Sequence, residues 1–175
     1  SLPNADVVDW VMVELRDAVS AAAADESTTF DRMAGFILKD GSVVALDGSS
    51  YLVGEGVVSN GLFVVIRHRN HLDVMSANAL VPSGGTYSYD FTSGSLQAYG
   101  TDSQINLGGG VYGMRGGDSN KDNMVSAMDY NIWSDLAGNS AGYDLEDYNF
   151  DTQIDNKDKN DAWFGNAGHE TQIPE

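Results

Sequence analysis

Two short windows in the last third of the sequence carry oxygen-bearing side chains at alternate positions. The first begins at Asp118 and the second at Asp147, 29 residues later. Calcium takes about six to eight oxygen ligands, and a 12-residue loop supplies them from positions 1, 3, 5, 7, 9 and 12, with position 7 using its backbone carbonyl. Both windows fit this spacing and therefore predict two calcium sites. The expected ligands are Asp118, Asn120, Asp122, Met124, Ser126 and Asp129 in the first loop, and Asp147, Asn149, Asp151, Gln153, Asp155 and Asp158 in the second.

The residues around these ligand positions repeat as well. Val125 and Ile154 stand at position 8, where an apolar side chain is expected if the two loops pair through a short β-contact. Each loop runs into a segment that we expect to be helical, Ala127–Leu136 after the first and 157–164 after the second, and each segment contains a tryptophan. One such loop would be a modest signal. Two in register favour metal binding over the simpler alternative of two acid-rich, solvated turns.

Electrostatics leads to the same prediction. Without an ion, the aspartates of each loop would converge and repel, so metal binding is expected to contribute to the folding energy of this part of the chain. Position 6 normally holds glycine because its φ is positive. Here it holds Asn123, which tolerates that geometry, and Thr152, which tolerates it less well. The second site is therefore expected to have a strained turn. Magnesium fits such loops poorly because it demands a tight octahedron.

The composition excludes several other classes of function. The chain has 26 acidic and nine basic side chains and a formal net charge of −17. Such a charge disfavours binding to nucleic acids and anionic membranes. It favours a monomer, because copies of the chain repel one another. There is no cysteine, so neither disulfides nor thiolate metal sites are expected. No apolar run reaches the roughly 18 residues of a membrane span, and no leader is present, so we expect a mature piece of a larger protein.

Two further groups of residues allow more than one interpretation. The basic cluster 67–71 (RHRNH) could bind an anionic or sugar ligand, or a metal through His68 and His71, or pair across strands with acids such as Glu14 or Asp17. Aromatic residues in the strand-like runs could form a sugar-stacking platform or belong to the core, which is the commoner case. These aromatic residues are Trp10, Tyr51, Phe63, Tyr87, Tyr89 and Tyr99. No HExxH or P-loop motif is present, and we expect a protein that is not an enzyme.

The first two-thirds of the chain has the pattern of short β-strands. Apolar or alternating runs between Gly, Ser and Asn turns predict strands at 7–15, 33–39, 42–46, 61–69, 73–80 and 86–91. The Asp40-Gly41 pair between two of these runs is a strong hairpin signal, and several short strands of this kind favour a β-sandwich. We expect a β-sandwich domain over 1–97, a Gly/Ser-rich connecting segment over 98–116 and a calcium-binding module over 117–175. The last is short and should pack against the rest.

The order of these motifs resembles that of a known family. Paired loops with Asp at position 12, each followed by a short helix, look like the dockerin type I repeat, an EF-hand-like calcium motif of cellulosomal and bacterial surface proteins. The wider chain is similar to a C-terminal module of large secreted Bacteroidetes surface proteins, with matching segments at 8–17, 34–48, 64–77, 89–92, 99–102, 117–122 and 166–174. The 29-residue repeat is longer than the usual dockerin spacing. Asn131, Lys159 and Asn160 differ from the recognition residues typical of dockerin helices.

The resemblance implies an extracellular or cell-surface protein with an immunoglobulin- or transthyretin-like sandwich ahead of a dockerin-like part. The first hypothesis is therefore a non-catalytic, calcium-stabilised interaction or anchoring module of a larger multidomain protein, with an unidentified cohesin-like protein partner. The alternative is a carbohydrate-binding or hemagglutinin-like adhesive module, in which calcium is structural and a glycan is the ligand. The two hypotheses share the calcium sites and differ in what the module binds.

Overall fold

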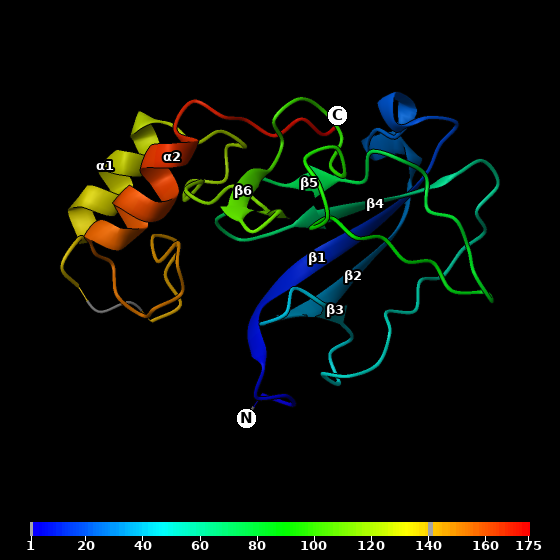
Figure 1. Cartoon of the computed structure of the whole chain (residues 1–175), viewed down its shortest axis with the longest axis horizontal. Coiled ribbons are helices and arrows are strands. Elements are labelled where there is room, and N and C mark those ends of the chain that lie inside the picture. The colour runs from blue at the N-terminus through cyan, green and yellow to red at the C-terminus, as the bar shows by residue number, and fades with distance from the viewer. Residues whose placement is uncertain (1, 140–141) are drawn as a thin grey trace.

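The computed structural model of the chain describes residues 2–139 and 142–175. These residues form a mainly β protein with a small helical part at its C-terminal end (Figure 1). The general fold class expected from the sequence is therefore confirmed. No helix among the described residues is long and apolar enough to cross a membrane.

The largest element is a five-stranded antiparallel sheet with the strand order β3-β2-β1-β4-β5. Its central strand is rich in valine, pairs with β2 over most of its length and pairs with β4 over its second half. The predicted hairpin is confirmed, because Gly41 has a φ of 85° and the amide of Leu38 donates to the carbonyl of Ser42. The strands are β1 (Val7–Asp17), β2 (Thr29–Leu38), β3 (Val43–Val44), β4 (Leu62–Arg67) and β5 (Val74–Met75).

One face of this sheet is covered by the main hydrophobic core. Side chains alternate along a strand, so Val11 and Val13 of β1 point into the core together with Val64 and Ile66 of β4. The cover is mostly irregular chain rather than a second large sheet. Its partly buried side chains that pack on the core include Leu52, Leu80, Tyr89, Phe91 and Met114. The finer expectation of a two-sheet sandwich is thus not confirmed.

The alternating segment 86–91 is not a strand, contrary to the prediction. Of its three alternating aromatic side chains, Tyr89 and Phe91 pack on the core, whereas Tyr87 is exposed. The Tyr89 hydroxyl donates to the carbonyl of Gln97 at 2.6 Å and accepts from the amide of Ala77 at 3.1 Å. A side chain therefore replaces a ladder of backbone hydrogen bonds. The run expected at 73–80 likewise contains only the two residues of β5.

The opposite face of the sheet is mostly polar along β1. Trp10, Met12, Glu14 and Arg16 alternate with the core residues and lie on this side. A second, smaller core occupies the end of this face near η1 (Ala21–Ala23) and η2 (Glu26–Thr28). Its buried members are Ala18, Ala24, Phe63, Val65 and Met75. The rest of this face carries charged side chains rather than a cover of apolar ones.

The segment expected to be a simple connection contains a small hairpin. Strands β6 (Ile105–Gly108) and β7 (Val111–Gly113) pair with each other across a turn at Gly109 and Gly110. Both turn glycines have positive φ, 63° and 83°, which residues with a Cβ rarely adopt. The glycine run therefore marks a tight turn as well as a change of composition.

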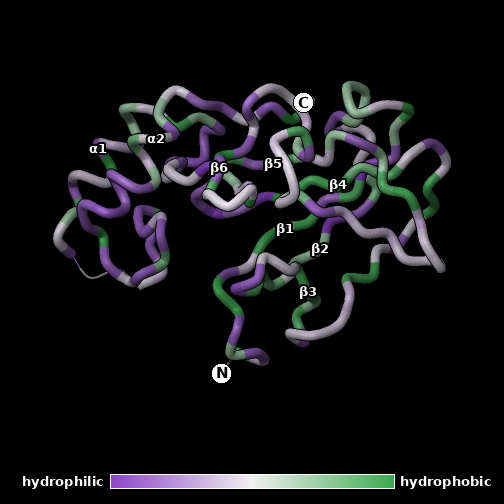
Figure 2. The backbone as a smooth tube through the Cα atoms, in the orientation of Figure 1, coloured by the Kyte–Doolittle hydropathy of each residue, from purple (hydrophilic) through white to green (hydrophobic). Residues whose placement is uncertain are grey.

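The helical part lies at one end of the molecule (Figure 1). Helix α1 (Ala127–Leu136) has the predicted bounds, and the second predicted helix consists of η3 (Asp158–Trp163), a π-helix, followed by α2 (Phe164–Asn166). Figure 2 shows hydrophobic chain along β1 and β4 and largely hydrophilic chain around α1 and α2. After α2 the chain runs back to the sheet, where Arg16 donates to the carbonyl of Pro174 at 2.8 Å. The two parts are therefore in contact, as expected.

Candidate metal centre

Both predicted loops are closed by the same hydrogen bonds from their first residue. The carboxylate of Asp118 accepts from the amides of Asp122 and Asn123, each at 3.2 Å. In the second loop Asp147 accepts from the amides at the same two positions, at 3.1 and 3.0 Å. A carboxylate at position 1 thus organises the turn that follows it.

The last residue of each loop ties its two ends together. Asp129 accepts from the amide of Ser119 at 2.9 Å and from that of Ser126 at 2.7 Å. Asp158 accepts from the amides of the equivalent residues of the second loop, both at 2.8 Å. The first and last carboxylates of each loop therefore both accept hydrogen bonds from the backbone of that loop.

The backbone conformation repeats too. Lys121 and Asn123, at positions 4 and 6 of the first loop, have φ of 60° and 69°. Phe150 and Thr152, at the same positions of the second loop, have φ of 62° and 69°. The positive φ expected at position 6 is present in both loops, including at the β-branched Thr152, where it is unfavourable. The positive φ at position 4 was not expected from the sequence.

The other predicted ligands are engaged within their own loops. At position 3 the amide oxygens of Asn120 and Asn149 accept from the backbone two residues later, at 3.0 and 2.9 Å. At position 5 the Asp122 carboxylate accepts from the Asn120 side chain at 2.9 Å, whereas Asp151 forms a 2.8 Å ion pair with Lys157. Position 7 would contribute only the main-chain carbonyls of Met124 and Gln153.

Position 9 has a second role as a helix cap. The Ser126 hydroxyl accepts from the amide of Met128 at 3.1 Å and forms a capping box with Asp129 at the start of α1. Asp155 accepts from the amide of Lys157 at 2.6 Å in the second loop. The same residues therefore end the loop and begin the helix, which explains why α1 begins where the loop spacing predicts.

The carboxylates at the ends of the loops are buried. Asp118, Asp129, Asp147 and Asp158 are at most 3% exposed. Burial raises the pKa of Asp118 to about 6, helped by the charges of Asp129 and Asp122 and opposed by that of Lys121. Burial also raises the pKa of Asp147 and of Asp158. Ionised carboxylates in such surroundings favour a cation beside them.

The donor set of each loop is mixed. Among the described residues, no three His, Asp or Glu side chains lie close enough together to hold a metal by themselves. A metal here would depend on amide, hydroxyl and backbone carbonyl oxygens beside the carboxylates. A set of hard oxygen atoms without nitrogen or sulfur suits calcium rather than zinc or copper.

The two loops do not pair through position 8 as expected. Val125 and Ile154 are buried, but each pairs with chain that follows the other loop's helix. Val125 donates to the carbonyl of His169 at 2.9 Å, and Ile154 donates to that of Asn139 at 3.2 Å. Gly168 and Gly138 donate in turn to Val125 and Ile154, both at 2.8 Å. The expectation of a direct β-contact is wrong because these exchanged segments occupy the hydrogen-bonding edges.

The tryptophan of each helix likewise forms a hydrogen bond with the opposite loop. The indole of Trp133, in α1, donates to the carbonyl of Asp155 at 3.1 Å, and that of Trp163 donates to the carbonyl of Ser126 at 2.9 Å. Each helix thus binds position 9 of the opposite loop. Trp133 is 15 residues after the start of its loop and Trp163 is 16. The π-helix η3 absorbs this extra residue and brings Trp163 into the equivalent place.

Asn70 joins both loops to the sheet, and sequence reasoning gave it no such role. It is fully buried just after β4. Its side-chain amide donates to the carbonyls of Leu145 and Asp147 at 2.9 and 3.0 Å. Its backbone carbonyl accepts from the amides of Gly117 and Asp118 at 3.0 and 3.2 Å. One residue therefore holds the beginning of both loops.

The rest of the basic cluster has structural partners. Arg67 pairs with Glu14 at 3.3 Å, which is the cross-strand pairing considered from the sequence. His68 lies 3.2 Å from Asp9, and His71 lies 2.8 Å from the side chain of Asn70. Burial lowers the pKa of His71 to about 3. The two imidazoles therefore bind different partners, although their rings pack edge to face with the centroids 4.8 Å apart.

The aromatic residues fall into two groups. Phe63, Tyr89 and Tyr99 belong to or pack against the hydrophobic cores, whereas Trp10 and Tyr51 are exposed. They do not form one platform.

Comparisons with known proteins give no relative for this chain. No protein-family model, curated protein or solved structure matches it.

Proposed function

We propose that this chain is a non-catalytic, calcium-stabilised interaction or anchoring module of a larger secreted or cell-surface protein. The observation that carries the proposal is the repetition of one hydrogen-bonding pattern in two loops that each bury two carboxylates. The ion pairs of the described residues include none of these four carboxylates. Calcium, bound through the oxygens of each loop, would neutralise the buried charge and hold the loop closed.

The dockerin-like character is part of this proposal. It is supported by the exchange of tryptophans and post-helix segments between the loops, because each half of the helical part then completes the other. A single loop would leave its position 8 backbone and the opposite indole without partners. We therefore expect both calcium ions to stabilise one cooperative unit rather than two independent loops.

A protein partner is supported by the surface of the helical part. Apolar side chains are exposed there on α1, on α2 and in the first loop. They are Met124, Met128, Tyr130, Leu136 and Phe164. Several exposed apolar side chains on two short helices are consistent with docking to another protein, as in dockerin-like modules. The expected partner is a cohesin-like protein, and the extracellular setting follows from the family resemblance.

The decisive experiment is a calcium titration combined with thermal melts in calcium and in chelator. We expect two bound calcium ions and a stabilisation of about 3 kcal/mol per site at a hundredfold excess over the dissociation constant. Magnesium at the same concentration is the control and should stabilise much less. An unchanged melt and no heat of binding would reject the proposal.

A further inference from the structure

The polar face of the sheet is hollowed where it is not covered by apolar side chains. Two adjoining cavities of about 440 and 360 Å³ lie there and share Met12, Arg67 and Asn123 in their walls. Strand β1 forms the floor, from Trp10 in the smaller cavity to Arg16 in the larger. We refer to these two cavities together as the groove.

The groove collects the positive charge of an acidic protein. Five of the nine basic residues of the chain line it, against four of the 26 acidic ones. The basic residues are Arg16, Arg32, Arg67, Arg69 and Lys121. The rest of the molecule is therefore strongly acidic, so an anion meets less electrostatic repulsion at the groove than over the remaining surface.

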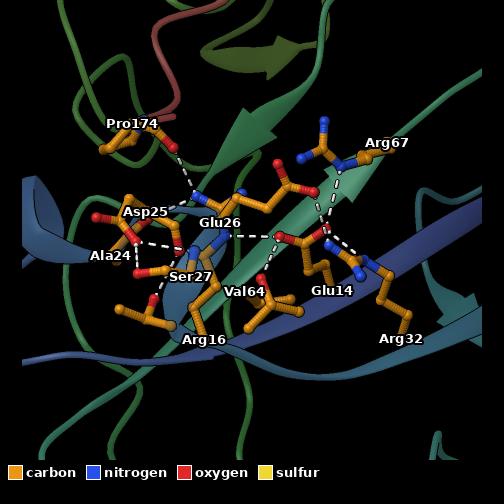
Figure 3. Close-up of polar contacts among 12 residues, drawn as sticks. Glu14, Arg16, Ala24, Asp25, Glu26, Ser27, Arg32, Val64, Arg67 and Pro174 are labelled. Atoms are coloured by element: carbon orange, nitrogen blue, oxygen red, sulfur yellow. Dashed lines mark hydrogen bonds and ion pairs between the residues drawn. The ribbon is translucent and has the colours of Figure 1, made fainter.

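A buried carboxylate fixes the guanidinium groups. Glu14 is fully buried and accepts from Arg16 at 2.7 Å, Arg32 at 3.0 Å and Arg67 at 3.3 Å, as Figure 3 shows. Arg32 is 45% exposed. Among the described residues, Nη1 of Arg32 and Nη2 of Arg67 have no protein acceptor. Both arginines are thus held in place, and each still has one guanidinium nitrogen that can donate to a ligand. This arrangement is suited to carboxylate oxygens.

An aromatic surface lies beside these donors. Trp10 is 45% exposed, lines the smaller cavity and is followed along the floor by Met12. Asp73, Asn123 and Thr171 add carboxylate, amide and hydroxyl groups to the walls. The groove therefore combines an apolar ring face, hydrogen-bonding groups of both kinds and partly free guanidinium groups.

This combination matches one class of ligand. A uronate-containing sugar chain has apolar ring faces, many hydroxyls and one carboxylate on each acidic sugar. An extended peptide would use its backbone, but the floor strand β1 already pairs with β2 and β4, so its backbone groups are engaged. We propose that the groove binds an acidic polysaccharide, with sugar rings against Trp10 and carboxylates at Arg32 and Arg67.

The test is calorimetric titration with tetrasaccharides of galacturonate, mannuronate and glucuronate, and with a neutral galactose tetrasaccharide. At least one uronate should bind about tenfold more tightly than the neutral sugar, because charge-assisted hydrogen bonds are lost without the carboxylates. Binding should weaken several-fold between about 0.05 and 0.5 M salt. Equal binding of the neutral sugar, or binding of none of the sugars, would overturn the proposal.

Variants locate the binding. Trp10→Ala and Arg32→Gln should each lower the affinity about tenfold. The matched controls are Tyr51→Ala, which removes an exposed aromatic ring, and Lys39→Gln, which removes an exposed charge outside the groove. Both should bind as the parent does. An affinity that Trp10→Ala and Arg32→Gln leave unchanged would place the sugar elsewhere and refute the assignment.

A tetraglutamate peptide completes the series. Binding of the peptide as tight as that of the best uronate would assign the groove to acidic proteins and overturn the sugar proposal. Lys121 and Asn123 of the first loop also line the groove, so each variant is compared with the parent both in calcium and in chelator. A failure of calcium binding would appear in the melts and is distinguishable from a failure of the groove.

Discussion

Two regions of the molecule bury carboxylates in opposite ways. In the sheet, Glu14 is surrounded by three arginines, and Asp9 accepts from Arg69 and the Tyr143 hydroxyl and lies beside His68. In the loops, the buried aspartates face backbone amides and other acids. Among the described residues, ion pairs reach the buried carboxylates of the first region, whereas in the loops the one ion pair is that of the less buried Asp151 with Lys157.

The pKa values record this difference. Burial would raise the pKa of Glu14, but hydrogen bonds from Thr29, Arg16 and Arg32 outweigh burial and lower it to about 2. In the loops burial prevails and raises the pKa of Asp118 to about 6. The buried charge of Glu14 is thus compensated within the fold, whereas under the proposed function the loop carboxylates require an added cation.

The largest effect is expected from Glu14→Gln. This change leaves Arg16, which is 1% exposed, with a buried charge and no carboxylate partner. We expect a loss of about 3–5 kcal/mol in the free energy of unfolding, equal in calcium and in chelator. Chemical denaturation measures it, with the exposed Glu55→Gln as control. A loss of less than about 1 kcal/mol would show that water rather than Glu14 solvates the arginines.

The next largest effect separates the two loops. Asp129→Asn and Asp158→Asn should each remove one calcium ion and about 2.7 kcal/mol of the stabilisation seen at a hundredfold excess of calcium. In chelator the same changes should cost much less, because the loss of one loop-closing hydrogen bond is offset by the removal of buried negative charge. Calcium titration and melts in both conditions measure the difference. The exposed Asp135→Asn in α1 is the control. Destabilisation of the same size with and without calcium would mean that these carboxylates act only as caps.

A smaller effect is expected at the connection between the regions. Asn70→Ala leaves the carbonyls of Leu145 and Asp147 without their donor and should cost roughly 1–3 kcal/mol. Hydrogen exchange should then increase at the beginning of the second loop more than within β1. The exposed Asn78→Ala should leave exchange unchanged. Faster exchange confined to the sheet would show that Asn70 does not position the loops.

Local patterns were predictable from the sequence. The closed turn of each loop and the bounds of α1 depend on residues within one short window, and β1 and β4 are apolar runs that propensity identifies. The π-helix could also have been predicted from the sequence. Ala137-Gly138 and Ala167-Gly168 repeat after 30 residues, although the loops repeat after 29, and the extra residue has to be absorbed in the second helix.

Contacts between distant segments were not predictable. Nothing in the sequence near Asn70 indicates that its partners lie about 75 residues further on. Nor does the alternation of 86–91 reveal that Tyr89 binds the carbonyl of Gln97 instead of joining a sheet. The same applies to the exchanged pairing of Val125 and Ile154. In each case the local sequence pattern fits more than one structure, and a hydrogen bond made only in the tertiary fold decides between them.

The smallest effect distinguishes the two regions by pH. In the metal-free protein, Asp118 takes up a proton in the folded state near pH 6 but in the unfolded state only near its ordinary value of 3.8. The folded state therefore binds more protons between these values, and stability should rise by about 1 kcal/mol as pH falls from 7 to 5. Glu14 acts with the opposite sign: its contribution is present above pH 4.5 and is lost only as pH falls towards about 2. Denaturation midpoints in chelator at pH 7, 6 and 5 measure the rise. Calcium should abolish it, since a bound cation holds the loop carboxylates ionised, and a rise that persists in calcium would assign it to groups outside the loops.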